Sequence, residues 1–222
     1  MHGRVRSHTA RSWTIALALL VALMTGALVA SSAQAQQDNF LNGNGLTGAA
    51  TFGANQIYLP NAVAPVSGAV PQGAVSLTMD TVRPGTGTNN VGFANARLVM
   101  VYQTSGVVSA PTAGDQTAVT LSDQTAGHWE FARLLAAGGV SGSTLNFDAP
   151  LIHSYAAGST QVIAVPEYTT VTLSNAGARV DAQAWDGASG GVLVVLANNQ
   201  INFSVAGPRM RAEASGFRGG PT

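Results

Sequence analysis

The chain has 222 residues, a formal net charge of zero, no cysteine and no lysine. Only 9% of its residues are charged, against about 25% in an average soluble domain. The lack of cysteine excludes disulfides, thiolate catalysis and cysteine metal ligands. The charge balance argues against nucleic acid or an anionic membrane surface as a partner, because either would favour a basic patch.

Residues 1–35 are predicted to be a secretory signal peptide. Three arginines and no acidic residue precede the apolar stretch Thr14–Ala30, and the small residues Ala33 and Ala35 follow it, so cleavage is expected after Ala35. The alternative is a membrane anchor, but the stretch has 17 residues, fewer than the ~20 that span a bilayer. We therefore expect export by the general secretion route to the cell surface or the medium, with the periplasm as an alternative, and no transmembrane anchor after cleavage.

Cleavage would leave seven arginines and ten acidic residues, a net charge of −3. The next segment, residues 36–73, is rich in Asn, Gly, Ala, Gln and Pro and is predicted to be a flexible leader with one strand, Gln56–Leu59. Gly43, Gly45 and Gly48 match the dinucleotide-binding pattern G-x-G-x-x-G. No strand precedes the match and no helix pattern follows it, so we attribute these glycines to flexibility.

Residues 74–222 are predicted to form a β-rich surface module, because short apolar runs alternate with turn residues. In Trp129–Ala136, alternation places Trp129 and Phe131 on one face and Glu130 and Ala132 on the other; a helical turn is the alternative. The predicted strands before residue 174 are Val75–Thr81, Ala96–Tyr102, Thr117–Ser122, Trp129–Ala136, Thr144–Phe147, Gln161–Val165 and Thr169–Leu173.

Turn residues divide the C-terminal part about every ten residues, the spacing of an all-β sandwich, barrel or solenoid. Alternation predicts strands around Val180, Ile201–Val205 and Met210, and the continuous run Val192–Leu196 predicts a strand covered on both faces. The predicted fold class is all-β: an antiparallel sandwich or barrel-like domain that continues into short stacked strands, the start of a solenoid or β-helix. Sandwich and solenoid both remain open for the last strands.

Neither the serine motif nor the pair of histidines strongly indicates a nucleophile or a metal site. Gly187–Gly191 matches G-x-S-x-G around Ser189, but a strand pattern follows it and no histidine lies downstream, so a tight turn is favoured. His128 and His153 lack the spacing of a zinc site and are expected at strand ends or in loops. No catalytic, cofactor-binding or metal-binding residue is assigned, no cofactor is expected, and the ligand-binding residues are unknown.

Acidic and aromatic residues leave further alternatives. The acids available for glycosidic chemistry show no spacing that singles out a pair. Asp181, Asp186 and Asn198 on successive turns offer a weak calcium site. Four aromatic residues offer either a carbohydrate-stacking platform or core packing, and core packing is favoured. The acids are Glu130, Asp148, Glu167, Asp181 and Asp186, and the aromatics are Trp129, Tyr155, Tyr168 and Trp185.

Several segments together suggest a family: GHWEF at 127–131, VSGSTL at 140–145, QVIAVPEYTTVTL at 161–173, AWDGASGGVLVVL at 184–196 and GFRGG at 216–220. They resemble a β-rich module of large bacterial surface proteins, including adhesin-type, adventurous-gliding-motility-type and tail-fibre-like proteins. The resemblance covers Ala96–Gly220 and implies a structural or adhesive role without catalytic residues. In that family GFRGG opens a longer glycine-rich continuation, whereas here only Pro221 and Thr222 follow, so a stand-alone or a truncated copy is expected.

We therefore expect a secreted, non-enzymatic, structural or adhesive cell-surface protein. The alternative is a secreted carbohydrate-binding or polysaccharide-processing protein. An outer-membrane barrel is disfavoured because most predicted strands are shorter than the ~9–11 residues that cross a membrane. The expected partners are a second copy of the chain, other surface proteins or polysaccharide, because few charges protect the strand edges from pairing.

Overall fold

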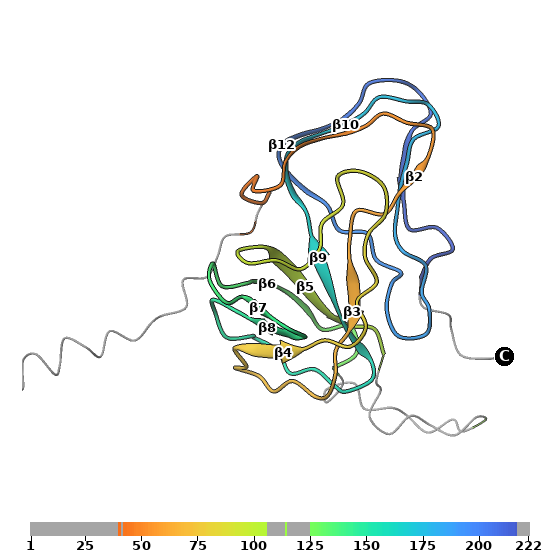
Figure 1. Cartoon of the computed structure of the whole chain (residues 1–222). Coiled ribbons are helices and arrows are strands. Elements are labelled where there is room, and N and C mark those ends of the chain that lie inside the picture. Colours follow the sequence, from red (N-terminus) through yellow and green to blue (C-terminus); the bar gives the residue numbers. More distant parts are fainter. Residues whose placement is uncertain (1–39, 41, 106–113, 115–124, 217–222) are drawn as a thin grey trace, which may run out of the picture. The chain divides into compact units, whose positions relative to one another are not determined.

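The computed structural model describes residues 40, 42–105, 114 and 125–216, and every regular element in these residues is a β-strand (Figure 1). The prediction of an all-β chain is confirmed. Within the same residues, no helix is long and apolar enough to cross a membrane. The predicted strand Thr117–Ser122 and the predicted signal peptide lie outside the described residues.

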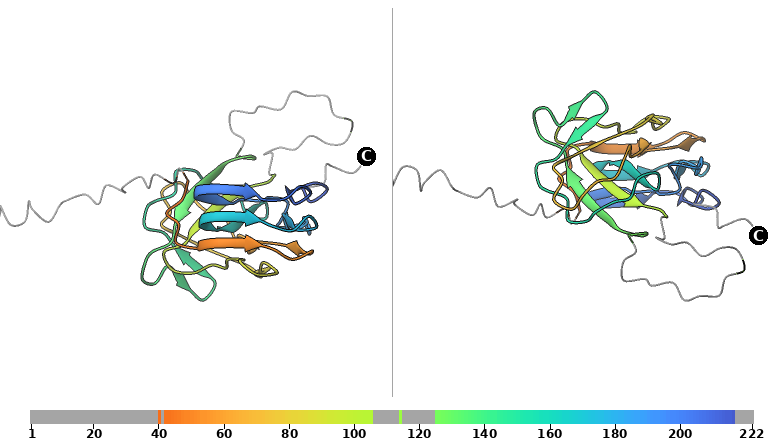
Figure 2. Two further views of the ribbon diagram at one scale, coloured as in Figure 1. Left: turned by 90° about the horizontal axis from the view of Figure 1, so that it is seen from above. Right: turned by 90° about the horizontal axis from the view of Figure 1, so that it is seen from below.

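Six strands form a stack of three parallel coils, which we call the three-coil stack. Each coil consists of a strand, a turn and a short strand, and equivalent strands of successive coils pair in parallel. Figure 2 shows the long strands of the three coils side by side in orange, cyan and blue. The coils are β1 (Gly48–Phe52) with β2 (Ile57–Tyr58), β10 (Glu167–Leu173) with β11 (Arg179–Asp181), and β12 (Leu196–Phe203) with β13 (Arg209–Arg211).

The coil containing β10 lies between the other two, and its inward side chains align with theirs. Phe52, Leu173 and Phe203 occupy one such column. The turns stack as well: a Cβ on Gly177 would lie 1.8 Å from Oδ1 of Asn55 in the neighbouring turn. Only glycine permits this close approach, which explains the turn signal at Asn175–Gly177. The stacked-strand prediction thus corresponds to a short parallel solenoid.

The prediction of a flexible leader at residues 36–73 is wrong for residues 42–73. This segment contributes β1, β2 and β3 (Val63–Pro65), and Phe52 and Tyr58 belong to the core of the stack. Gly45 serves close packing, since a Cβ at this position would lie 2.7 Å from Nδ2 of Asn198. Leader and C-terminal strands, more than a hundred residues apart in sequence, therefore form one core.

The chain between the first two coils folds into an antiparallel sandwich. The larger sheet has the order β3-β9-β5-β6 and the smaller one β4-β8-β7. Leu77 and Leu145 of the smaller sheet share a core with Val99, Val101 and Val162 of the larger one. The antiparallel part is thus a sandwich rather than a closed, barrel-like sheet. Its other strands are β4 (Ser76–Thr78), β5 (Leu98–Gln103), β6 (Trp129–Arg133), β7 (Val140–Ser141), β8 (Thr144–Asn146) and β9 (Thr160–Val165).

The two regions meet where β9 ends and β10 begins. β9 is buried along its whole length, Pro166 follows it, and Glu167 then starts β10. Proline has no N–H to donate to a ladder, so it suits the point where the chain leaves the antiparallel sheet and enters the parallel stack.

Alternation located most of the strands. Of the predicted strands that lie in the described residues, Val75–Thr81, Ala96–Tyr102, Thr144–Phe147, Gln161–Val165 and Thr169–Leu173 correspond to β4, β5, β8, β9 and β10. The range Trp129–Ala136 contains strand β6, which covers Trp129–Arg133, so the helical alternative is wrong.

The predicted buried strand Val192–Leu196 is also wrong. Residues 192–195 are half-buried and belong to no strand, and β12 begins only at Leu196. The amide of Asn61 takes the place of a strand partner: its Nδ2 donates to the Val194 carbonyl at 2.7 Å, and its Oδ1 accepts from the Val194 N–H at 3.3 Å. A buried side chain thus satisfies backbone groups that a ladder would otherwise pair.

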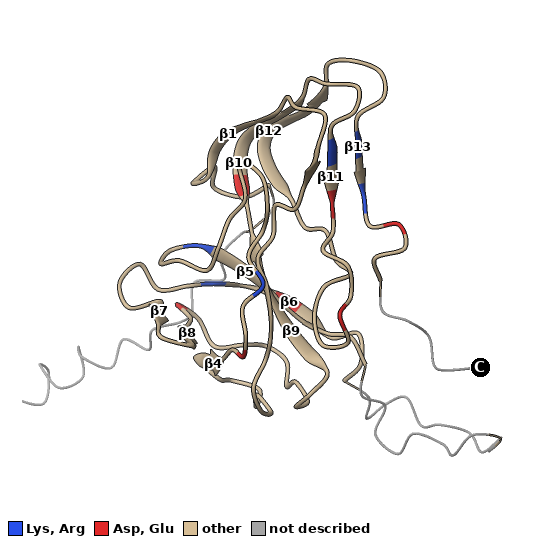
Figure 3. Ribbon diagram, turned by 45° about the vertical axis from the view of Figure 1, so that its right-hand side comes forward, with Lys and Arg blue, Asp and Glu red and all other residues tan. Residues whose placement is uncertain are grey.

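Charged residues are sparse in the described part of the chain and mostly occur as pairs (Figure 3). On the stack, Asp181 of β11 accepts hydrogen bonds from Arg179 and from Arg211 of β13. Because β11 and β13 pair in register, this cluster joins two neighbouring coils.

Candidate functional site

An aromatic row runs along the outward face of β6. Alternation places Trp129 and Phe131 on this face, as the sequence predicts, and Phe40 extends the row. The ring centroids of Trp129 and Phe131 lie 5.6 Å apart, and those of Phe131 and Phe40 lie 5.8 Å apart. Trp129 is 53% exposed. The row therefore presents an accessible strip of aromatic surface.

Glu130, on the opposite face of β6, holds the strand in place through its hydrogen bonds. This buried carboxylate accepts hydrogen bonds from the N–H groups of Ile152 (2.7 Å) and His153 (3.0 Å) and from the Tyr155 hydroxyl (2.8 Å). Burial raises the pKa of the Tyr155 hydroxyl above its ordinary value, and the hydrogen bond to Glu130 raises it further. The hydroxyl consequently remains a donor, and β6 is held rigidly under Trp129.

A buried ion pair anchors the other end of the row. Arg133 donates from Nη1 and Nη2 to the two carboxylate oxygens of Glu167, at 2.8 and 2.9 Å. The same guanidinium lies 5.8 Å from the centroid of the Phe40 ring. Bidentate pairing has a fixed geometry, and it positions Phe40 beside β6. The pair also links β6 of the sandwich to β10 of the stack.

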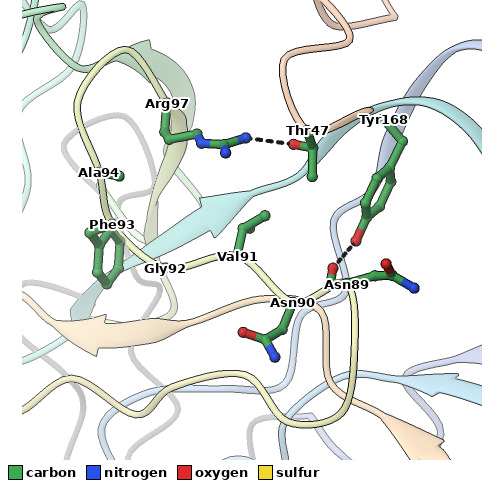
Figure 4. Close-up of a pocket in the computed structure, with 9 residues that line it drawn as sticks. All are labelled: Thr47, Asn89, Asn90, Val91, Gly92, Phe93, Ala94, Arg97 and Tyr168. Carbon is green, nitrogen blue, oxygen red and sulfur yellow. Dashed lines mark hydrogen bonds between the residues drawn. The ribbon is translucent and has the colours of Figure 1, made fainter. Parts of the chain in front are cut away.

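A cavity of about 340 Å³ lies next to this pair. Arg97 Nη1 donates to the Thr47 hydroxyl oxygen at 2.8 Å, and the Tyr168 hydroxyl donates to the Asn89 carbonyl (Figure 4). Burial raises the pKa of Tyr168, and the charge of Arg97 partly offsets that effect. The walls therefore combine a guanidinium, hydroxyl and amide groups and two aromatic rings. They comprise Thr47, Asn89, Asn90, Val91, Gly92, Phe93, Ala94, Arg97 and Tyr168.

The two histidines lie where the sequence predicts, just before β6 and in the loop after residue 151. Their rings stack with centroids 4.6 Å apart and an interplanar angle of 30°. Nδ1 of His128 is buried and has no hydrogen-bond partner. Within the described residues, no group of three His, Asp or Glu side chains could hold a metal ion.

Ser189 lies in a bend, in agreement with the predicted turn. Its N–H donates to Oδ1 of Asp186 at 2.9 Å, as does the N–H of Ala188. Its hydroxyl is buried without a partner, and β12 begins seven residues later. The strand–turn–helix geometry of a nucleophile elbow is absent at this motif.

Most of the acids considered for chemistry are engaged elsewhere. Glu130 holds backbone amides, Glu167 pairs with Arg133, Asp181 with Arg179 and Arg211, and Asp186 with Arg83 at 3.0 Å. The weak calcium site of Asp181, Asp186 and Asn198 is not formed, because arginines occupy the carboxylates of both aspartates.

The four-residue aromatic platform considered from the sequence is likewise not formed. Tyr155 and Tyr168 are buried in different cores, and only Trp129 contributes to an accessible row. Sequence reasoning missed Phe40, Thr47, Asn89 and Arg97. Alternation already placed Phe131 beside Trp129, but no local signal relates residues 40–47 to a strand more than eighty positions away.

No protein-family model and no curated protein sequence matches this chain. Among solved structures it is similar to the tailspike gp61 of Pseudomonas phage phi297 (14% identity, TM-score 0.30) and the tailspike gp49 of Pseudomonas phage LKA1 (12%, 0.31). It is also similar to the Gp54 tailspike of Acinetobacter baumannii bacteriophage AP22, solved in complex with A. baumannii capsular saccharide (12%, 0.32). These matches cover 67%, 60% and 72% of this chain but only 18%, 24% and 24% of the tailspikes.

The three structures named above are tailspikes, which agrees with the tail-fibre-like part of the sequence resemblance. The adhesin-type and gliding-motility-type parts stay predictions. The expectation that the protein is not an enzyme does not stand, because these structural neighbours are tailspikes. At TM-scores of 0.30 to 0.32 these likenesses identify no reaction for this chain.

Proposed function

We propose that this chain is a surface module that binds saccharides through the aromatic row of Trp129, Phe131 and Phe40. The observation that carries the proposal is the exposure of Trp129 on a rigid strand: the residue is more than half accessible, although large aromatic side chains are usually buried. An exposed indole offers an apolar face to the C–H groups of a pyranose ring, and its N–H can bond a hydroxyl.

The surroundings of the row support this use. Phe131 and Phe40 continue the aromatic surface beyond the length of one ring, which suits an oligosaccharide rather than a single sugar. Glu130 on one side and the Arg133–Glu167 pair on the other hold the row in place without ligand. Preorganisation of this kind lowers the entropic cost of binding.

The test uses the full chain with Trp13→Phe and Trp185→Phe, which leaves Trp129 as the one tryptophan. Neutral glucose hexasaccharides of α-1,4 and β-1,4 linkage and surface polysaccharide from the source cells are titrated while tryptophan fluorescence is recorded. We expect at least one of them to change the fluorescence of Trp129. Trp129→Ala should then weaken binding roughly tenfold or more, as the loss of a buried aromatic contact implies.

Ile152→Ala is the matched control, because Ile152 is also an exposed large apolar residue of the antiparallel sandwich. It should bind as the parent does. Equal affinity of the Trp129→Ala variant and the parent, measured by calorimetry, would exclude the row as the binding surface.

A structural role through self-association remains a second candidate function, since β12 lies at a sheet edge among the described strands and carries exposed apolar residues. Secretion and surface location also remain predictions. Protease shaving of intact cells should release peptides of residues 74–222 while cytoplasmic and periplasmic control proteins stay intact.

A further inference from the structure

Arg97 differs from most of the described arginines in its electrostatic surroundings. Arg83, Arg133, Arg179 and Arg211 each lie within 4 Å of a carboxylate. No described carboxylate pairs with Arg97, whose guanidinium donates instead to the neutral hydroxyl of Thr47. A half-buried guanidinium without a counter-charge is poorly compensated, and an anion that reached it would gain charge-assisted hydrogen bonds.

Glu167, an acidic residue close to the cavity, does not supply that counter-charge. The backbone N–H of Glu167 donates to Thr47 at 3.0 Å, so this residue lies close to the cavity. Both of its carboxylate oxygens, however, are occupied by Arg133, and Oε1 also accepts from the N–H of Asn44. Arg133 thus neutralises Glu167, and the charge of Arg97 remains available to a ligand.

The rest of the cavity suits a hydroxylated ring. Asn89 and Asn90 place polar groups around it, Tyr168 contributes a hydroxyl that stays protonated, and Phe93 supplies an aromatic ring (Figure 4). Its volume of about 340 Å³ lies at the lower end of the range for small-ligand sites. A compact ligand with one anionic group and several hydroxyls fits these walls better than a flat apolar one.

We propose that this cavity binds the carboxylate-bearing residue of an acidic saccharide, with the guanidinium of Arg97 as its counter-charge. The inference deepens the proposed function, because it assumes that the protein binds saccharides, and it assigns the acidic sugar to a site separate from the aromatic row. Arginine is suited to this role since its planar fork matches the two oxygens of a carboxylate.

The probes are trimers of galacturonate, glucuronate and mannuronate, each compared with its methyl ester, which keeps the sugar and removes the charge. Binding to the full chain is measured by calorimetry at low ionic strength. At least one acid should bind tenfold or more tighter than its ester, the difference expected for charge-assisted hydrogen bonds. If no acid binds, or if every acid and ester bind equally, the proposal is wrong.

Substitutions of two arginines test whether the preference for the acid over its ester depends on Arg97. Arg97→Gln should abolish the preference for the acid, and Arg97→Lys should retain part of it, because lysine keeps the charge without the fork. Arg209→Gln is the control: it removes the same charge from an exposed position on β13 and should leave the preference intact. An unchanged preference in Arg97→Gln would overturn the assignment.

Two further measurements test the cavity independently of the Arg97→Gln variant. If Arg97→Gln does not fold, Tyr168→Phe removes one hydroxyl from the cavity and should weaken acid binding several-fold; an unchanged affinity would count against the site. The ¹⁵Nε resonance of Arg97 should shift on addition of the acid and not of the ester. Loss of binding in Trp129→Ala with no effect of Arg97→Gln would support the proposed function and refute only this inference.

Discussion

The three-coil stack and the antiparallel sandwich bury their apolar side chains in different ways. In the sandwich two sheets face each other, and the core residues that they contribute are all nearly inaccessible. In the stack each inward side chain is covered by its equivalents in the neighbouring coils. Phe52 and Leu173 are 0% exposed, whereas Phe203, in the same column of the last coil, is 49% exposed. A facing sheet closes the core of the sandwich, whereas no further described strand covers the inward side chains of β12.

The largest expected effect concerns the connection between the two regions. Glu167→Gln keeps the shape of the side chain but leaves the guanidinium of Arg133 without its buried counter-charge. We expect a loss of about 3–5 kcal/mol in the free energy of unfolding, the usual cost of breaking a buried pair. Urea denaturation followed by circular dichroism measures it.

Glu213→Gln provides the control for that experiment. Glu213 pairs with Arg211 at 3.3 Å, but its side chain is 77% exposed, and an exposed pair contributes only about 0–1 kcal/mol. Similar losses in the two variants would mean that the Arg133–Glu167 pair does not stabilise the junction of sandwich and stack.

The second prediction compares two positions of one column. Leu173→Ala removes a side chain covered on both sides and should cost about 2–5 kcal/mol. Phe203→Ala removes a larger side chain that is half exposed, and its cost should be about 1–2 kcal/mol. The same denaturation experiment checks both. A cost for Phe203→Ala as large as that for Leu173→Ala would show that the last coil is covered in solution.

The sandwich was more predictable from the sequence than the stack. Alternation depends on a strand's own residues, so β5, β6, β8 and β9 could be located without knowledge of their partners. β1 and β2 are short and lie in Gly- and Asn-rich sequence. They become strands because they pair in parallel with β10 and β11. The register joins residues more than a hundred positions apart, which local composition does not reveal.

The candidate site likewise has one part that the sequence predicts and one part that it does not. The common face of Trp129 and Phe131 follows from a period of two, and the sequence predicts it. Phe40 joins the row only because Arg133 and Glu167 position it, and Arg97 borders a cavity only because Thr47 and Tyr168 belong to adjacent coils. Val192–Leu196 shows the converse: its apolar run has the composition of a buried strand, but the Asn61 amide occupies the backbone groups of Val194.

The smallest expected effect on stability belongs to the open end of the stack, where the self-association predicted from the sequence would be favoured. β12 pairs with β10 alone among the described strands, and residues 196–205 contain no charge that would oppose a second β12 edge. Ile201, Phe203 and Val205 are exposed beside that edge, so two copies meeting there would cover each other's open columns.

Ile201→Lys should therefore shift the protein towards the monomer in sedimentation velocity over a hundredfold range of concentration, with little change in the stability of the monomer. Ile152→Lys places the same charge on an exposed isoleucine of the sandwich and should associate as the parent does. The two substitutions separate an effect of the open stack from a general effect of charge. A parent protein that stays monomeric at every concentration would contradict this prediction. It would show that the protein tolerates an open solenoid end, with its apolar columns partly in water, because the two covered coils already stabilise the third.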